Sequence, residues 1–242
     1  MFRPQIQKTS ILVMLAFLNL IMVYWALNSY ERYPTFGFDQ KSRAIGIMKT
    51  AINSLRTVFI EKSINSNIDI ESFGDFLIGP EHSVVQTTMG SRISKQSTLN
   101  PDFSAVVMEM LIELEIDSSD YVAISYTGSY PGANLAVLSA IESIQAKPII
   151  ISSCGASGYG ATNIEMIWID MENYLFEQKV FSNKSYFASI GGGLDIGTQL
   201  DVEGLQICEK SFHKNGIRPL GISNIEENID RRMEYYQSYA QD

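Results

Sequence analysis

Histidine and cysteine are scarce in this 242-residue chain, which has only His82, His213, Cys154 and Cys208 of these two types. No Cys or His spacing typical of a metal site is present, so we expect neither a metal nor a cofactor. His213 lies near the end of a predicted helix, where an imidazole is more commonly a partner of the helix dipole than a catalyst. The two cysteines permit one disulfide in an oxidising compartment and do not require it.

Basic residues are also few, 18 against 27 acidic residues. Residues 1–30 hold Arg3, Lys8 and no acidic residue, so the other 16 basic and 27 acidic residues give a net charge of −11. A surface of this charge repels nucleic acid and anionic lipid at long range. We therefore expect no nucleic-acid partner, and an acidic ligand would have to be held by backbone amides or a few local cations.

One long uncharged apolar run is present, the 17 residues Ile11–Leu27. As a helix it would span about 26 Å, close to the roughly 30 Å hydrocarbon core of a bilayer. Because Arg3 and Lys8 precede the run, the positive-inside rule predicts a single-pass protein of the cell (inner) membrane, with a cytoplasmic N-terminus and the large domain outside. A cleaved signal peptide is the alternative, although the run is long for one and Ala26-Leu27-Asn28 is a poor cleavage site.

Three segments follow from this patterning: an anchor with its flanks at 1–30, an amphipathic segment at 31–65 and an α/β domain at 66–242. Between Asp39 and Ile64, apolar residues recur every three or four positions, which predicts a helix that serves as a stem or as the first packed helix. Asn100 and Pro101 predict the start of another helix. The buried stripe expected on that helix comprises Phe103, Val106, Val107, Met110, Leu111 and Leu114.

Strand and helix patterns then alternate along the chain. Short strands are predicted at 83–87, 121–126, 148–152, 186–190 and 217–222, with helices at 134–145, 163–178 and 202–214 and a last helix opened by Ser223-Asn224-Ile225-Glu226. A tyrosine cluster in the last helix is expected to pack on the sheet (Tyr235, Tyr236 and Tyr239). Apolar strands joined through helices predict a parallel, doubly wound (Rossmann-like) sheet with helices on both faces, preceded by the one transmembrane helix.

Three of the predicted strands run directly into small-residue loops: the first loop, Thr127–Asn134, the second loop, Cys154–Ala161, and the third loop, Gly191–Gly197. Loops after successive parallel strands emerge at one edge of a sheet, so we expect these three to meet in one crevice. Glycines there allow close backbone approach, and hydroxyls and amides can bind anionic groups. The ligand-binding residues that we predict are Thr127, Gly128, Ser129, Gly155, Ser157, Gly158, Gly191, Gly192 and Asp195.

None of these loops carries a recognisable catalytic motif. The first loop is neither a Walker loop nor G-x-G-x-x-G, and it is not a G-x-S-x-G nucleophile elbow. Ser129, Ser157 or Cys154 would act as a nucleophile only with a base, and the sequence pattern identifies none. Asp170 and Glu172 would not share a helix face, so catalysis by paired carboxylates has no support.

Several short motifs nevertheless occur in an order that resembles one family. They are Ile78-Gly79-Pro80-Glu81, Thr87-Thr88-Met89-Gly90, Asn100-Pro101-Asp102-Phe103, segments 126–135 and 152–161, Trp168-x-Asp170-Met171-Glu172 and Asn228-Ile229-Asp230-Arg231-Arg232. Over most of residues 77–236 the chain resembles the poly-γ-glutamate system proteins, membrane-anchored accessory proteins of the apparatus that makes and exports this amide-linked capsule polymer. The resemblance implies two partners, the cytoplasmic poly-γ-glutamate synthase ligase and a multispanning membrane subunit, and it transfers no catalytic residue.

Two functions are expected from these observations. The first is a noncatalytic accessory subunit whose outer domain binds nascent polymer or partner subunits at the three loops. The alternative is a surface serine or cysteine hydrolase or transpeptidase that acts on poly-γ-glutamate through Ser129, Ser157 or Cys154. A nucleotide-binding regulator fits the predicted fold but conflicts with an outer location.

Overall fold

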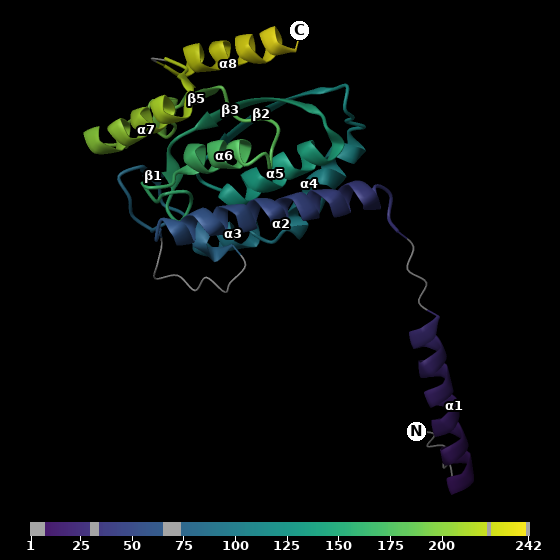
Figure 1. Ribbon diagram of the computed structural model, residues 1–242. Helices are drawn as coiled ribbons and strands as arrows, with labels where there is room; N and C mark the ends of the chain where they lie inside the picture. Colours follow the sequence, from purple (N-terminus) through teal and green to yellow (C-terminus); the bar gives the residue numbers. More distant parts are fainter. Residues whose placement is uncertain (1–7, 30–33, 65–73, 222–223, 241–242) are drawn as a thin grey trace, which may run out of the picture. The chain divides into compact units, whose positions relative to one another are not determined.

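The computed structural model describes residues 8–29, 34–64, 74–221 and 224–240 (Figure 1). The chain divides into two compact units, Met1–Phe36 and Gly37–Asp242. The first unit contains α1 (Thr9–Asn28), a helix of 20 residues none of which is buried. At 1.5 Å per residue it is about 30 Å long, the thickness of a bilayer core. Its length and composition are those of a helix that could cross a membrane, as the sequence predicts.

The second unit begins with α2 (Phe38–Glu61), and from β2 onward its strands and α-helices alternate, apart from β4, which follows β3 directly. Its elements are α2, η1 (Asp75–Leu77), β1 (Gln86–Thr88), α3 (Arg92–Ser97), α4 (Asp102–Glu113), β2 (Tyr121–Thr127), α5 (Pro131–Ile144), β3 (Lys147–Ser153), β4 (Ala156–Ser157), α6 (Trp168–Glu177), β5 (Phe187–Ser189), η2 (Gly193–Asp195), α7 (Val202–Asn215), β6 (Arg218–Pro219) and α8 (Ile225–Tyr239).

All strand pairs in the described residues are parallel, which confirms the α/β class. The larger sheet has the order β2-β3-β5-β6, and β2 pairs with β3 over seven residues, from Tyr121 opposite Lys147 to Thr127 opposite Ser153. The four strands therefore follow one another across this sheet in the order of the sequence, without a reversal of that order. A separate two-stranded sheet joins β1 to β4, so the second loop folds back beside the segment before α3.

Helices cover both faces of the larger sheet (Figure 1). On one face, Ile124 and Ile150 pack in a core shared with Leu135 of α5, Met171 of α6 and Ile52 of α2. Since α2 lies in this core, the segment for which we predicted a stem or a packed helix is a packed helix.

Helix α8 covers the opposite face, as Figure 1 shows. The Tyr235 ring stacks on the Phe187 ring with 3.6 Å between centroids, and the Tyr236 hydroxyl donates to the Ile124 carbonyl at 3.0 Å. The predicted packing of the tyrosine cluster is confirmed. Asn224 caps α8 by accepting a hydrogen bond from the Glu227 amide at 2.9 Å, whereas Ser223 of the predicted capping box lies outside the described residues.

Two expectations about helices are wrong in part. Val106 and Met110 of α4, and Leu114 directly after it, are exposed, because the face of α4 that carries Ser104 and Met108 packs against the neighbouring helices. Helix α6 begins at Trp168 rather than at residue 163, since the Asn163 side chain accepts from the Glu165 amide in a local turn that competes with helix.

Candidate functional site

The three loops lie side by side at one edge of the sheet, with the second loop in the middle. The Ala161 amide donates to the Gly128 carbonyl at 2.7 Å, which joins the second loop to the first. On its other side, the Gly155 amide donates to the carbonyl of Ile190 at 2.7 Å, directly before the third loop. The neighbourhood that we predicted for these loops is therefore present.

The loops pack closely and do not enclose one open crevice. A Cβ on Gly160 would lie 2.7 Å from the Gly128 carbonyl oxygen, and one on Gly158 would lie 2.7 Å from that of Glu81. These glycines are required by backbone contact within the protein, and Gly128, Gly155 and Gly191 are also buried. Ligand binding remains a prediction for the loop residues, which include the exposed Thr127 and Gly192.

A buried lysine meets the second loop at Ser157. Lys95 comes from α3, whose N-terminus is capped by Ser91, and it retains 2% of its accessible surface. Its Nζ donates to Ser157 Oγ at 2.6 Å and lies 3.6 Å from the centroid of the Tyr130 ring. Ser129 fixes the backbone at this point, because its Oγ accepts from the Ser157 amide at 3.0 Å.

The charge of Lys95 lacks an ion-pair partner in the part of the chain that the structure describes. Among the described residues, no carboxylate lies within ion-pair distance of its Nζ, whereas Lys41, Lys214, Arg231 and Arg232 all have one. Burial therefore lowers the pKa of Lys95 from its ordinary value of 10.5, since loss of water disfavours the charged form.

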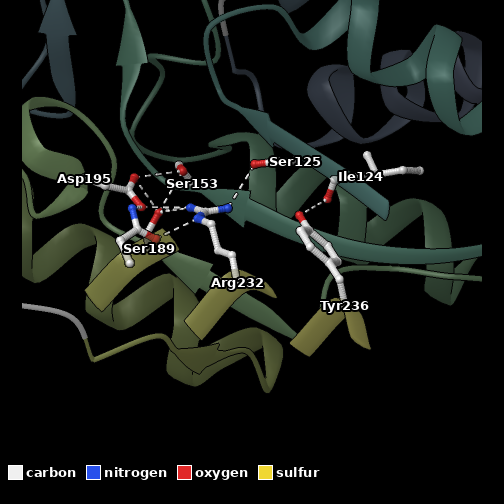
Figure 2. Close-up of polar contacts among 8 residues, drawn as sticks. Ile124, Ser125, Ser153, Ser189, Asp195, Arg232 and Tyr236 are labelled. Carbon is white, nitrogen blue, oxygen red and sulfur yellow. Dashed lines mark hydrogen bonds and ion pairs between the residues drawn. The ribbon is translucent and has the colours of Figure 1, made fainter. Parts of the chain in front are cut away.

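A second cation at the same edge, Arg232 of α8, is paired with Asp195 (Figure 2). Asp195 Oδ2 accepts from Arg232 Nη2 at 2.8 Å and from Asn228 Nδ2 at 2.6 Å. Its Oδ1 accepts from Ser189 Oγ at 2.7 Å and from Ser153 Oγ at 3.3 Å. The predicted ligand-binding carboxylate of the third loop is thus occupied by protein groups on both oxygens.

The same arginine ties α8 to the strand ends. Arg232 Nη1 donates to Ser125 Oγ of β2 at 2.9 Å, and Nη2 donates to Ser189 Oγ of β5 at 2.9 Å (Figure 2). Asp195 itself has a left-handed backbone, with φ at 63°. Holding a non-glycine residue there costs on the order of 1 kcal/mol or more, which the hydrogen bonds of this cluster offset.

Glu172 of α6 carries a buried carboxyl group. The Tyr126 hydroxyl donates to Glu172 Oε1, and Ser185 Oγ donates to the same oxygen at 3.0 Å. Glu172 Oε2 is buried and has no hydrogen-bond partner among the described residues. Burial raises the pKa of Glu172, and burial beside Glu172 raises that of Tyr126 well above its ordinary value.

Two cavities flank the packed loops. The Arg92 cavity, of about 550 Å³, is lined by residues that include Gly79, Glu81, Arg92, Tyr159, Thr162 and Glu203. The His213 cavity, of about 570 Å³, is lined largely by apolar side chains together with Asp195, Glu209 and His213. The second loop therefore borders the first cavity through Tyr159, and the third loop borders the second cavity through Asp195.

The two cysteines are joined by a buried disulfide, Cys154–Cys208, which links the second loop to α7. Cys154 consequently has no thiol with which to act as the nucleophile of the alternative function. Among the described residues, no group of His, Cys, Asp and Glu side chains could hold a metal ion.

Sequence reasoning missed Lys95, Arg232 and the pairing of Glu172. Lys95 lies in a six-residue helix and bonds to a residue 62 positions away, so no local pattern marks it. Comparison with protein-family models, curated proteins and solved structures found no match to this chain.

Proposed function

We propose that this chain is a single-pass accessory subunit of a poly-γ-glutamate synthesis and export complex, anchored by α1 with its N-terminus in the cytoplasm and its α/β domain outside. The synthase ligase and a multispanning membrane subunit are its proposed partners, and the polymer is its proposed ligand. The ordered motifs between residues 77 and 236 support the choice of polymer. We also propose that the α/β domain belongs to the doubly wound, Rossmann-like fold class.

The observation that carries this proposal is the Cys154–Cys208 disulfide in a chain that also has an apolar helix, long enough to cross a membrane, near its N-terminus. Disulfides persist in oxidising compartments and are rare in the cytosol. A domain tethered on the outer side of the membrane would meet the polymer as it leaves the cell.

Arg92 is the proposed contact for the polymer. It is exposed, lines the Arg92 cavity and lies beside the second loop, which supplies Tyr159 to the same cavity. A guanidinium group binds carboxylates through two parallel hydrogen bonds, and poly-γ-glutamate presents one free carboxylate per unit. Local recognition of this kind is needed, because a domain with a net charge of −11 repels a polyanion at long range.

Deletion of the gene tests the cellular role. We expect the deletion strain to show changed polymer yield, chain length or surface retention, restored by the full chain and not by a chain lacking residues 9–28. Normal polymer by all three measures would contradict the proposal.

Calorimetric titration of the full chain in detergent micelles with γ-linked glutamate oligomers tests the ligand. Arg92→Glu should weaken binding about tenfold, the loss of roughly 1.5 kcal/mol expected for a charge-assisted hydrogen bond. Lys210→Glu, an equal charge change at an exposed residue of α7, is the matched control and should bind as the unmodified chain does. Absence of binding heat, or equal losses in both variants, would contradict a polymer site at Arg92.

A further inference from the structure

The contact between Lys95 and Ser157 supplies a base where the sequence shows none. We propose that Ser157 is an acyl-accepting nucleophile with Lys95 as its general base, so that the α/β domain catalyses acyl transfer from carboxylic amides or esters. This activity goes beyond the accessory role and does not depend on poly-γ-glutamate being the substrate.

The two reacting groups are already within proton-transfer distance. Lys95 Nζ and Ser157 Oγ are 2.6 Å apart, inside the range that general-base catalysis requires. Ser157 is held from two directions, by the Ser129 hydroxyl at its amide and by the pairing of β4 with β1. The backbone of Ser157 is therefore fixed beside the lysine, and Ser129 is a positioning residue.

The surroundings of Lys95 favour the neutral amine that a base must provide. No carboxylate among the described residues stabilises its charge, in contrast to Arg232. Helix α5 begins at Pro131, one residue after the Tyr130 ring that Lys95 contacts, so the positive end of the helix dipole lies close by. That positive end disfavours a second positive charge on Lys95 and favours a developing oxyanion.

Ser157 is not sealed from solvent, since 9% of its accessible surface remains. Arg92 of α3, the helix that carries Lys95, lines the Arg92 cavity. Tyr159, two residues after Ser157, opens onto the Arg92 cavity. The Arg92 cavity is therefore lined by residues from the two segments that carry the reacting groups, and it is the space that we assign to the acyl group.

The reaction proceeds in two balanced steps. In the first, the Ser157 Oγ proton passes to the Lys95 amine, Oγ forms a bond to the carbonyl carbon, and the bond from that carbon to the leaving nitrogen or oxygen breaks as the Lys95 ammonium returns the proton to the leaving group. In the second, water or an acceptor amine attacks the Ser157 ester, its proton passes to Lys95, and Ser157 Oγ leaves and recovers a proton.

The test is acylation of the full chain, in detergent micelles, by p-nitrophenyl acetate. We expect a burst of p-nitrophenol and one acetyl group located on Ser157 by mass spectrometry. Ser157→Ala and Lys95→Arg should each lower the acylation rate at least about 100-fold, because a guanidinium keeps its proton and general-base catalysis is worth 10²–10⁴. The acylation rate should rise with pH and then level off. The midpoint of the rise should lie at a pH below 10.5, the ordinary pKa of lysine.

Ser153→Ala is the matched control, since Ser153 is a buried serine of the same edge that contacts Asp195 instead of a lysine. It should acylate at the rate of the unmodified chain. No acylation above that of Ser157→Ala, acetyl groups on another residue, or an unchanged rate in a folded Lys95→Arg variant would each overturn the proposal. In all three cases Lys95 would be a structural donor to Ser157.

Discussion

Two mostly buried cations lie on serine side chains at the same edge of the sheet, and they differ in what neutralises them. Arg232 faces Asp195 at 2.8 Å, and both oxygens of that carboxylate are fully bonded. Lys95 faces Ser157 and an aromatic ring, with no carboxylate in reach among the described residues. The first arrangement fixes α8 to the strands, whereas the second allows a proton to pass between Lys95 Nζ and Ser157 Oγ.

The chemistry of the two side chains agrees with this division. Arginine stays protonated at any physiological pH and binds planar partners through a rigid fork, so it suits a permanent clamp. Lysine changes its pKa readily when it is buried, so it suits a proton-transfer role. The predictions below test whether the two clusters differ in this way, beginning with the residue pair that affects both.

The largest effect is expected from the disulfide, because Cys154 lies between Ser153 of the Arg232 cluster and Ser157 of the Lys95 cluster. The bond spans 54 residues, and replacing Cys154 and Cys208 by alanine should lower the free energy of unfolding by about 4 kcal/mol. Urea unfolding of both proteins measures the difference. A change of less than about 1 kcal/mol would show that the second loop is held without it.

Removal of the paired cation should come next. Arg232→Met leaves Asp195 without its ion-pair partner and should lower the free energy of unfolding by about 3 kcal/mol. A double-mutant cycle with Asp195→Asn should show a combined loss smaller than the sum of the two single losses. A combined loss equal to the sum of the two single losses would mean that Arg232 and Asp195 contribute to stability independently.

Like Lys95, Glu172 is a buried ionisable group, and its Oε2 atom has no hydrogen-bond partner among the described residues. Its pKa is raised in the folded protein, so the folded state binds the proton more tightly than the unfolded state does. The unfolding free energy should therefore fall as pH rises above about 4.5 and through the folded pKa. Glu172→Gln should remove this part of the pH dependence, and an unchanged slope would contradict the buried carboxyl described above.

The smallest effect on stability is expected at Lys95. Because its charge is buried without a counter-ion among the described residues, Lys95→Met should change the free energy of unfolding by no more than about 1 kcal/mol near pH 7, in contrast to Arg232→Met. The lowered pKa means that the unmodified protein gains stability as pH rises toward 10.5, and the variant should lose that gain. A loss as large as that of Arg232→Met would remove the difference between the two clusters.

Local sequence patterns predicted the four strands of the larger sheet, the helices that follow them and the meeting of the three loops, because strand and helix periods and glycine-rich turns are properties of adjacent residues. They did not predict the short elements α3 and β4, which carry Lys95 and Ser157. They did not predict which face of α4 is buried, since Val106 and Met110 are exposed only because of how α4 meets its neighbours. The two cation clusters also escaped prediction. Lys95 and Arg232 bond to partners 62 and 37 positions away, and nothing in either segment specifies such a partner.

The titration of Lys95 itself tests the central contrast most directly. Nuclear magnetic resonance of the full chain with isotope-labelled lysine, in detergent micelles, would follow each ε-methylene signal, with Lys95→Met to assign the one of interest. The account predicts that Lys95 titrates below 10.5, apart from the exposed lysines. A midpoint at or above that value would contradict it, since Lys95 would then hold its proton as firmly as a paired cation does.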